Sequence, residues 1–252
     1  MFNRFDRLPE RQYSSVIGAR VRFRFHGELN DFLPTDRRNI EFESPAGITD
    51  TIKHVIESLG VPHTEFDRIL VNGHPRLSSE QLQDGDIVEV FPYVLPVVLN
   101  DPRFVLDGHL GRLAAYLRML GFDTWYDNTA DDVLLAAVSD REHRVLLTRD
   151  IGLLKRREVK SGYCVRSDQP HDQLREVVRR FALQAYFAPF ARCMDCNGTL
   201  HSVSKEEVID LLPPHTRETK DNFSRCAACH KVFWRGSHHA QMLEWVQQLM
   251  RS

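Results

Sequence analysis

The stretch FVLDGHLGRLAAYLRMLGFD, residues 104–123, constrains the fold of this chain more than any other. It starts as a short apolar run, reaches Asp107 and a glycine, and continues with leucines at helical spacing. The pattern predicts a strand and then a helix that packs its leucines on a sheet, with Arg112 and Arg118 on other faces. Ligands of open α/β sheets bind beyond the carboxyl ends of the strands, so Asp107 is positioned for chemistry. The simpler alternative is that it only caps the helix.

The alternation of strand and helix patterns continues after this stretch. Strands are expected at 124–126, 144–148 and 162–165, and helices at 131–138, 151–159 and 173–183. Such alternation is typical of an α/β fold with a mostly parallel sheet and flanking helices. We assign this α/β domain to residues 103–190.

An aspartate follows each of these strands. The aspartates are Asp107, then Asp127 with Asp131 and Asp132 beyond it, then Asp150 and Asp168. Because the carboxyl ends of parallel strands share one edge of the sheet, we expect several of these carboxylates to converge. Clustered carboxylates repel one another unless a cation neutralises them, and Mg²⁺ or Mn²⁺ takes oxygen ligands together with substrate phosphate. The edge therefore indicates metal-dependent chemistry on a phosphodiester.

Basic side chains lie close to these aspartates in the sequence. Four of them are candidates for phosphate contacts: Arg112, Arg149, Lys155 and Arg156. Seven basic and three acidic residues occur between positions 141 and 160. On charge alone a solvated helix face explains this run, but together with the acids we favour contacts with a nucleic-acid backbone.

The N-terminal part of the chain shows a different pattern. Val21, Phe23 and Phe25 alternate with arginines as in a half-buried strand, and a helix is expected at 49–59. Further strand patterns follow, the last entered through a DGD turn, and together they predict a small β-grasp unit at residues 19–93. Residues 1–18 are expected to be a flexible lead, and the proline-containing segment 94–102 to be a linker.

Four cysteines in two CxxC pairs predict a structural zinc site in the C-terminal part, residues 191–252. They are Cys193, Cys196, Cys226 and Cys229. Two redox CxxC motifs are a weaker alternative, because neither pair follows a strand-to-helix turn. A short helix is expected at 205–212 between the pairs, and a longer one after His238 with Met242, Trp245, Val246 and Leu249 inward.

Five other side chains in or near this part have a simple expected role. Cys164 is expected to be a buried core residue. For Phe233 and Trp234 we expect packing beneath the cysteines, with stacking on a base as the alternative. His238 and His239 are expected to be an ordinary exposed pair.

The motifs D-x-x-LGRLA-x-x-LR-x-LG-F-D and LLTRD, taken together, resemble the PIN-like ribonucleases of the Mut-seven carboxy-terminal family over most of residues 103–232. The resemblance implies hydrolysis of RNA by Mg²⁺ or Mn²⁺ held on acids, with a 5′ phosphate and a 3′ hydroxyl in the products. Carried over by position, the catalytic acids are Asp107, Asp131 or Asp132, and Asp150, with Asp107, Asp132 and Asp150 as ligands of the catalytic metal. Asp168 is the candidate for a fourth acid. The family also carries a zinc module at this place.

The N-terminal unit resembles ubiquitin-like sulfur carriers of the ThiS and MoaD type, in Val71-Asn72-Gly73 and in Asp84-Gly85-Asp86. Those carriers work through a free Gly-Gly carboxyl terminus. No Gly-Gly occurs in this sequence, and the unit runs on into the following domain. Sulfur transfer is therefore disfavoured, and we expect a module that binds or positions a partner.

These observations favour a metal-dependent ribonuclease over a non-catalytic RNA-binding or ribosome-associated module. The expected cofactors are structural Zn²⁺ and catalytic Mg²⁺ or Mn²⁺. The expected partners are RNA, including structured RNA such as tRNA or rRNA, and a protein bound through the β-grasp unit. The start of the chain has no secretory pattern and no apolar run is long enough for a bilayer, so we expect a soluble, cytoplasmic protein without membrane contact.

Overall fold

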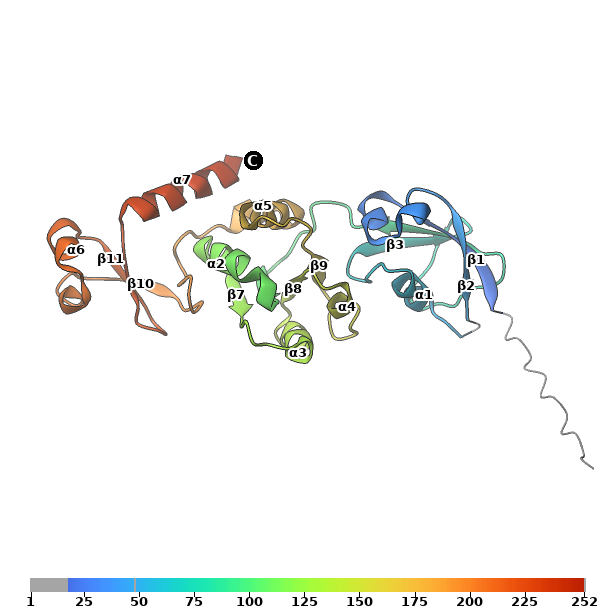
Figure 1. Cartoon of the computed structure of the whole chain (residues 1–252), viewed down its shortest axis with the longest axis horizontal. Coiled ribbons are helices and arrows are strands. Elements are labelled where there is room, and N and C mark those ends of the chain that lie inside the picture. The colour runs from blue at the N-terminus through green and yellow to red at the C-terminus, as the bar shows by residue number, and fades with distance from the viewer. Residues whose placement is uncertain (1–17, 48, 252) are drawn as a thin grey trace, which may run out of the picture.

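The computed structural model describes residues 18–47 and 49–251, and shows three units in a row along the long axis (Figure 1). The β-grasp unit lies at one end, the α/β unit in the middle and the cysteine-bearing unit at the other end. Residues 1–17, where we expected a flexible lead, lie outside the described part of the chain. Among the described residues, no helix combines the length and the apolar character needed to cross a bilayer.

The N-terminal unit is a five-stranded sheet in the order β2-β1-β5-β3-β4 with helix α1 (Ile52–Ser58) packed on it. Strands β1 and β5 are parallel neighbours at the centre and the other pairs are antiparallel, which is the β-grasp arrangement that the sequence predicts. The side chains of Val21, Phe23 and Phe25 are fully or almost fully buried, as expected. The strands are β1 (Ala19–Phe25), β2 (Phe42–Ala46), β3 (Phe66–Val71), β4 (His74–Pro75) and β5 (Ile87–Pro92).

The central unit is a four-stranded, fully parallel sheet in the order β7-β6-β8-β9. Two helices pack with one face of the sheet and two with the other, because alternate residues of β6 point to opposite sides: Leu106 joins the core under α2 and α5, and Val105 joins the core under α3 and α4. The strands are β6 (Arg103–Leu106), β7 (Asp123–Tyr126), β8 (Val145–Thr148) and β9 (Gly162–Cys164). The helices are α2 (Gly111–Met119), α3 (Asp132–Glu142), α4 (Ile151–Leu154) and α5 (Pro170–Phe181).

Helix α4 is much shorter than the 151–159 that the sequence predicts. The chain leaves the helix after Leu154 and folds back so that Val159 is completely buried in the core under α3 and α4. A straight helix through this segment would carry Val159 away from that core. Helix α5, by contrast, begins three residues before the predicted start, because Pro170 occupies its first turn.

The C-terminal unit has an antiparallel sheet β10-β11-β12, formed by Leu200–Val203, Phe223–Cys226 and Val232–Trp234. The helix predicted at 205–212 is wrong: this segment holds only a 3₁₀ turn, Ile209–Leu211, and α6 (Pro214–Thr219) starts at a proline that favours the first helical position. Helix α7 (Ser237–Arg251) runs back over the central unit, where Val246 and Leu249 are buried in the same core as α2 (Figure 1).

Both edges of the central sheet are capped by a side chain from a flanking unit. On the β9 edge, the carboxylate of Glu65 accepts a hydrogen bond from the N–H of Cys164 at 2.6 Å. On the β7 edge, the amide oxygen of Asn197 accepts a hydrogen bond from the N–H of Thr124 at 3.0 Å. An unpaired edge N–H otherwise costs stability or attracts another strand. The three units are thus joined through the edges of one sheet.

Glu65 is fully buried between two arginines of the central unit. Its Oε2 lies 3.6 Å from Arg166 and 3.7 Å from Arg180, and it accepts no hydrogen bond. Burial raises the pKa of Glu65 to about 7, although Arg180 and Arg166 both lower it. The two arginines therefore stabilise the charged form of Glu65 less than burial destabilises it.

The raised pKa of Glu65 predicts a fall in stability with rising pH. A carboxyl whose pKa is higher in the folded chain contributes its full stabilisation below its ordinary value of 4.5 and loses it as the pH rises to about 7. We expect E65Q to remove about 3 kcal/mol of this pH dependence in the free energy of unfolding, measured by urea titration from pH 4.5 to 8. The exposed E244Q variant is the control. Equal pH dependence in E65Q and the unmodified chain would contradict the assignment.

Candidate active site and metal centre

Asp107 lies directly after β6, with only 7% of its surface exposed. Its Oδ1 accepts a hydrogen bond from the N–H of His109 at 2.9 Å and so caps the short 3₁₀ turn Gly108–Leu110. The two glycines of DGHLG are explained by close approach. A Cβ on Gly108 would lie 3.2 Å from the carbonyl of Asn128, and one on Gly111 would lie 2.6 Å from the hydroxyl of Tyr126. The loops after β6 and β7 therefore meet at Asp107.

Thr148, the last residue of β8, connects Asp107 to Asp150. The Thr148 hydroxyl donates a short hydrogen bond to Oδ2 of Asp107 and accepts one from the N–H of Asp150 at 2.9 Å. The N–H of Arg149 also donates to Oδ2 of Asp107, at 3.3 Å. Our sequence reasoning missed Thr148, although its position between a buried strand and Asp150 in LLTRD was a usable signal.

This contact lies at the topological switch point of the sheet. From β6 the chain crosses on the α2 side to β7, and from β7 it returns on the other side to β8, so β6 and β8 are neighbours whose following helices leave on opposite faces. Ligands of open α/β sheets bind in the crevice that opens at such a point. Asp107 and Thr148 stand at the carboxyl ends of these two strands.

Asp131 and Asp150 also cap helices. Oδ1 of Asp131 accepts from the N–H of Leu134 at 2.8 Å, and Oδ1 of Asp150 accepts from the N–H of Gly152 at 2.6 Å. Asp132 is exposed and makes no side-chain hydrogen bond or ion pair with any described residue. The helix-capping role, which was the simpler alternative for Asp107, is therefore present there and at Asp131 and Asp150. Capping is compatible with metal binding, because each carboxylate oxygen has two lone pairs.

We call the carboxyl ends of β6 to β9, with Asp107, Asp132, Asp150 and Asp168, the acid edge. Asp168 follows β9 and pairs with Arg149 at 2.7 Å, so the fourth candidate acid is in contact with one of the candidate phosphate ligands. The acids do not form a tight cluster. In residues 18–47 and 49–251, the four cysteines are the one group in which three or more possible metal ligands lie within 4.8 Å of one another.

The structure separates the four basic candidates. Arg112 is exposed in the first turn of α2, and Arg149 lies at the acid edge. Lys155 instead donates to the carbonyl of Glu57 in the β-grasp unit at 2.6 Å, and burial there lowers its pKa. Arg156 lies beyond the C-terminal end of α4, with Nε 3.9 Å from Glu158. Asp150 lies at the N-terminal end of α4, whereas Lys155 and Arg156 follow its C-terminal end. Lys155 lies at the junction with the β-grasp unit.

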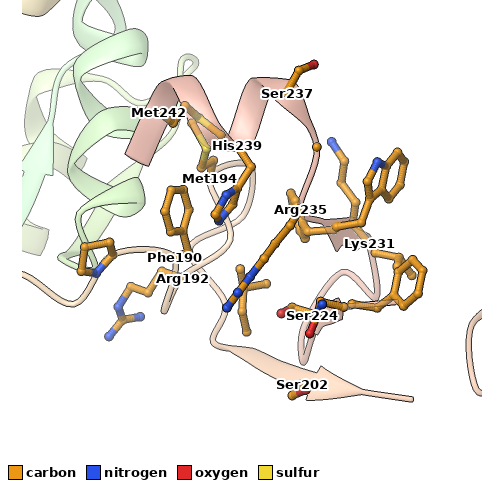
Figure 2. A pocket seen from close by; sticks show the side chains of 18 residues that line it. Phe190, Arg192, Met194, Ser202, Ser224, Lys231, Arg235, Ser237, His239 and Met242 are labelled. Carbon is orange, nitrogen blue, oxygen red and sulfur yellow. The ribbon is translucent and has the colours of Figure 1, made fainter. Parts of the chain in front are cut away.

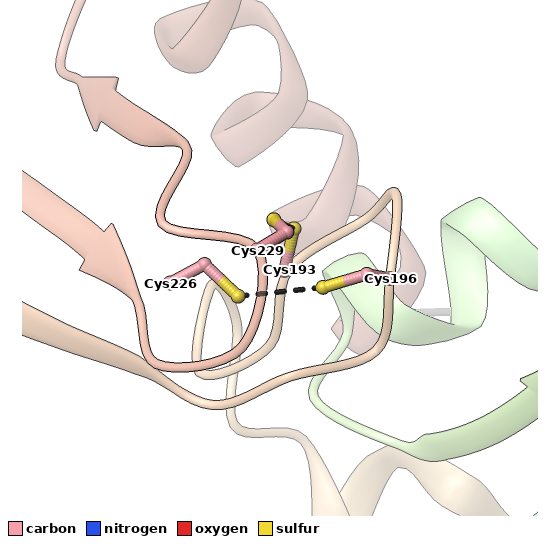
Figure 3. Close-up of side chains that lie close together, drawn as sticks. All are labelled: Cys193, Cys196, Cys226 and Cys229. Atoms are coloured by element: carbon pink, nitrogen blue, oxygen red, sulfur yellow. Dashed lines mark hydrogen bonds between the residues drawn. The ribbon is translucent and has the colours of Figure 1, made fainter.

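The four cysteine sulfurs form one cluster (Figure 3). The Sγ–Sγ distance is 3.8 Å between Cys193 and Cys229 and 3.4 Å between Cys196 and Cys226. A tetrahedral zinc ion with Zn–S bonds of about 2.3 Å requires sulfurs about 3.8 Å apart, so the residues fit structural zinc and leave no open position for catalysis. Cys164 is buried elsewhere, in the core under α3 and α4, as expected.

Each CxxC pair is followed by a residue with a left-handed backbone, and we call the tight turn that it closes a zinc knuckle. Asn197 has φ 69° and His230 has φ 61°. Gly198 lies so close to the second pair that a Cβ there would be 2.8 Å from the sulfur of Cys226. The two turns therefore pack against each other around the sulfurs.

The first knuckle is fixed to the central unit by Arg118 and Asp123. We expected Arg118 on an outward face of its helix, but it is buried, and its guanidinium donates to the carbonyls of Thr124, Met194 and Asp195. Burial alone would raise the pKa of Asp123, but hydrogen bonds from Arg144 and Asn197 hold it below its ordinary value. Both charges thus serve the contact between the zinc module and the sheet.

The model of the Mut7-C RNase domain matches residues 102–246, more than half of the chain. The chain belongs to the Mut7-C RNase family. This membership supports a ribonuclease, and the model of the Mut7-C ubiquitin domain matches residues 18–97. The resemblance found in the LGRLA and LLTRD motifs is therefore confirmed.

Solved structures similar to this chain are small proteins. The Haloferax volcanii small archaeal modifier protein 1 is 17% identical, with 31% of this chain and 100% of that chain covered and a TM-score of 0.25. The putative molybdopterin converting factor subunit 1 from Pyrococcus furiosus is 22% identical over the same shares, with a TM-score of 0.25. No curated protein matches the chain.

The cysteine cluster predicts one zinc ion per chain. We expect C226S to lose the metal and to lower the thermal unfolding temperature sharply, since a structural zinc ion contributes roughly 10 kcal/mol or more to folding. Metal content by mass spectrometry and unfolding by circular dichroism are the measurements. C164S is the matched control and should keep its zinc; a zinc-loaded C226S chain would contradict the assignment.

Proposed function

We propose that this chain is a metal-dependent ribonuclease that hydrolyses RNA phosphodiester bonds at the acid edge. The observation that carries the proposal is the position of Asp107. It is a nearly buried carboxylate at the switch point of a parallel sheet, held by Thr148 next to Asp150, in a chain of the Mut7-C RNase family. Asp107 also caps the turn after β6, but its carboxylate stands where ligands of open α/β sheets bind.

Asp107, Asp150 and Asp132, with Asp131 as the alternative to Asp132, would hold Mg²⁺ or Mn²⁺. Their oxygen ligands suit these hard cations, and Asp132 has both oxygens available among the described contacts. The metal would polarise the phosphate and activate a water, and the PIN resemblance implies products with a 5′ phosphate and a 3′ hydroxyl.

The chain's own groups would orient the acids and the substrate. The Thr148 hydroxyl and the N–H groups of His109 and Arg149 donate hydrogen bonds to the Asp107 carboxylate and fix its direction. The guanidinium groups of Arg112 and Arg149 supply positive charge for the RNA backbone, and Arg149 is anchored by Asp168. Lys155 and Arg156 are not part of this proposal, because their contacts place them beyond the other end of α4.

The β-grasp unit is proposed to position the nuclease on its substrate or on a protein partner in the cytoplasm. It is packed against the β9 side of the central unit, through Glu65 and through His63, which bonds the carbonyl of Val159 at 2.8 Å. The β-grasp unit therefore packs beside β9, and we propose that the carboxyl ends of β6 and β8 bind the metal and the RNA. Structured RNA such as tRNA or rRNA is the proposed substrate class.

A second candidate is a non-catalytic RNA-binding or ribosome-associated module. The spacing of the carboxylates favours it, since the described aspartates do not come within 4.8 Å of one another in a group of three. A pure binder would hold RNA equally well without Mg²⁺ or Mn²⁺ and would cleave none.

The ribonuclease proposal predicts loss of cleavage when an acid becomes an amide. We expect D107N and D150N to lower the rate of Mn²⁺-dependent cleavage of a labelled RNA by at least about 100-fold, because changes even to residues around a metal ligand cost 10- to 100-fold. D140N, an exposed aspartate of α3, is the matched control and should keep its activity. Full activity in D107N, or equal loss in all three variants, would overturn the assignment.

A further inference from the structure

A cavity of about 610 Å³ lies between the sheet of the zinc module and the start of α7 (Figure 2). Its walls come from three segments that are distant in the sequence: the chain before Cys193, the strands β10 to β12, and the first turns of α7. Nothing in the proposed nuclease site uses this cavity.

The side chains that line the cavity carry positive charge and no negative charge. Arg192, Lys231 and Arg235 take part in the lining, and neither an aspartate nor a glutamate does, in a chain with more acidic than basic residues. Acidic residues that do not line the cavity partly neutralise two of these cations: Lys231 pairs with Asp195, and Arg192 lies 3.6 Å from Asp123. Arg235 has no ion pair or hydrogen bond with any described residue, and it extends into the cavity in Figure 2. The cavity is therefore suited to an anion.

Flat rings supply much of the remaining lining. Phe190 and His239 have their ring centroids 4.3 Å apart at an angle of 31°, Phe233 is half-buried, and Trp234 is 37% exposed. The hydroxyls of Ser202 and Ser224 face the same space from the sheet. An exposed ring beside an unpaired arginine and hydroxyls is a combination that binds single-stranded nucleic acid, where bases stack and phosphates meet arginines. An acidic peptide would use the cations but would leave the exposed tryptophan without a partner.

A second cavity, of about 390 Å³, shares Met194 and Met242 with the first. It is lined by Arg112, Tyr116 and Trp245, and Arg112 belongs to the first turn of the helix that follows Asp107. The two cavities therefore form a path along α7 from the zinc module towards the acid edge.

We propose that the cavity between the zinc module and α7 binds a nucleotide of single-stranded RNA, with the base stacked on Trp234 and the phosphate on Arg235, and that the adjoining strand follows the path towards Arg112. The inference deepens the proposed ribonuclease function, on which it rests for the substrate, by proposing that a single-stranded segment of the RNA is held here, outside the acid edge.

The test measures binding separately from cleavage. Fluorescence anisotropy of a labelled ten-nucleotide single-stranded RNA is recorded with the full, zinc-loaded chain in the absence of Mn²⁺ and Mg²⁺. We expect W234A to weaken binding by roughly 5- to 150-fold and W234F to restore most of it, since stacking needs only a ring. R235A should weaken binding and lower the slope of log affinity against log salt by about 0.7, the value for one phosphate contact on a single strand.

The matched control is R157A, because Arg157 is a strongly exposed arginine beyond α4 and outside both cavities. It should bind RNA like the unmodified chain.

Cleavage by R235A in Mn²⁺ should show a raised KM with an unchanged kcat. Unchanged binding in both W234A and R235A, or equal weakening in R157A, would overturn the inference. If D107N abolishes cleavage while W234A and R235A both leave binding intact, this inference fails alone. If the unmodified chain cleaves no RNA but W234A and R235A weaken binding, the ribonuclease proposal fails alone.

Discussion

The two edges of the four-stranded parallel sheet are the constraint that organises the whole chain. Each edge strand carries backbone N–H groups that need an acceptor. Here Glu65 of the β-grasp unit caps β9, and Asn197 of the first zinc knuckle caps β7. The flanking units therefore complete the sheet as well as adding their own surfaces.

The sides of the sheet are closed in this way, and its carboxyl end is where we propose that the chemistry takes place. The buried carboxylate of Asp107 is stabilised there by Thr148 and by two backbone N–H groups. The same hydroxyl accepts from the N–H of Asp150, so the two acids of the family motifs are fixed relative to each other through one side chain. Zinc contributes indirectly, because the knuckle that the cysteines shape also supplies Asn197 to the sheet.

The features that could be predicted from the sequence are those encoded by local pattern. The apolar runs gave the strands, the strand ends gave Asp107 and Asp150, and the CxxC spacing gave the cysteine cluster. The parts that could not be predicted depend on partners distant in the sequence. Glu65 is separated from its Cys164 partner by 99 residues, and Arg118 from Asp195 by 77, so nothing near either charge shows that it is buried.

The contacts of two basic candidates also could not be predicted from the sequence. Lys155 and Arg156 resemble a phosphate-binding run in the sequence, but the early end of α4 turns Lys155 towards the β-grasp unit. The cavity beside α7 was equally hidden, because its cations and rings come from segments that meet only after the zinc module folds. A charge run along the chain therefore does not show which side chains meet in the folded structure.

The most direct test of the acid edge is to locate Mn²⁺ in crystals of the zinc-loaded chain by anomalous scattering at the manganese edge. We predict a manganese peak within bonding distance of Asp107 and Asp150 that disappears in D107N, while the zinc signal at Cys193 and its partners stays. A peak absent from the acid edge at Mn²⁺ concentrations that support cleavage would contradict the account, and would place the chemistry elsewhere in the molecule.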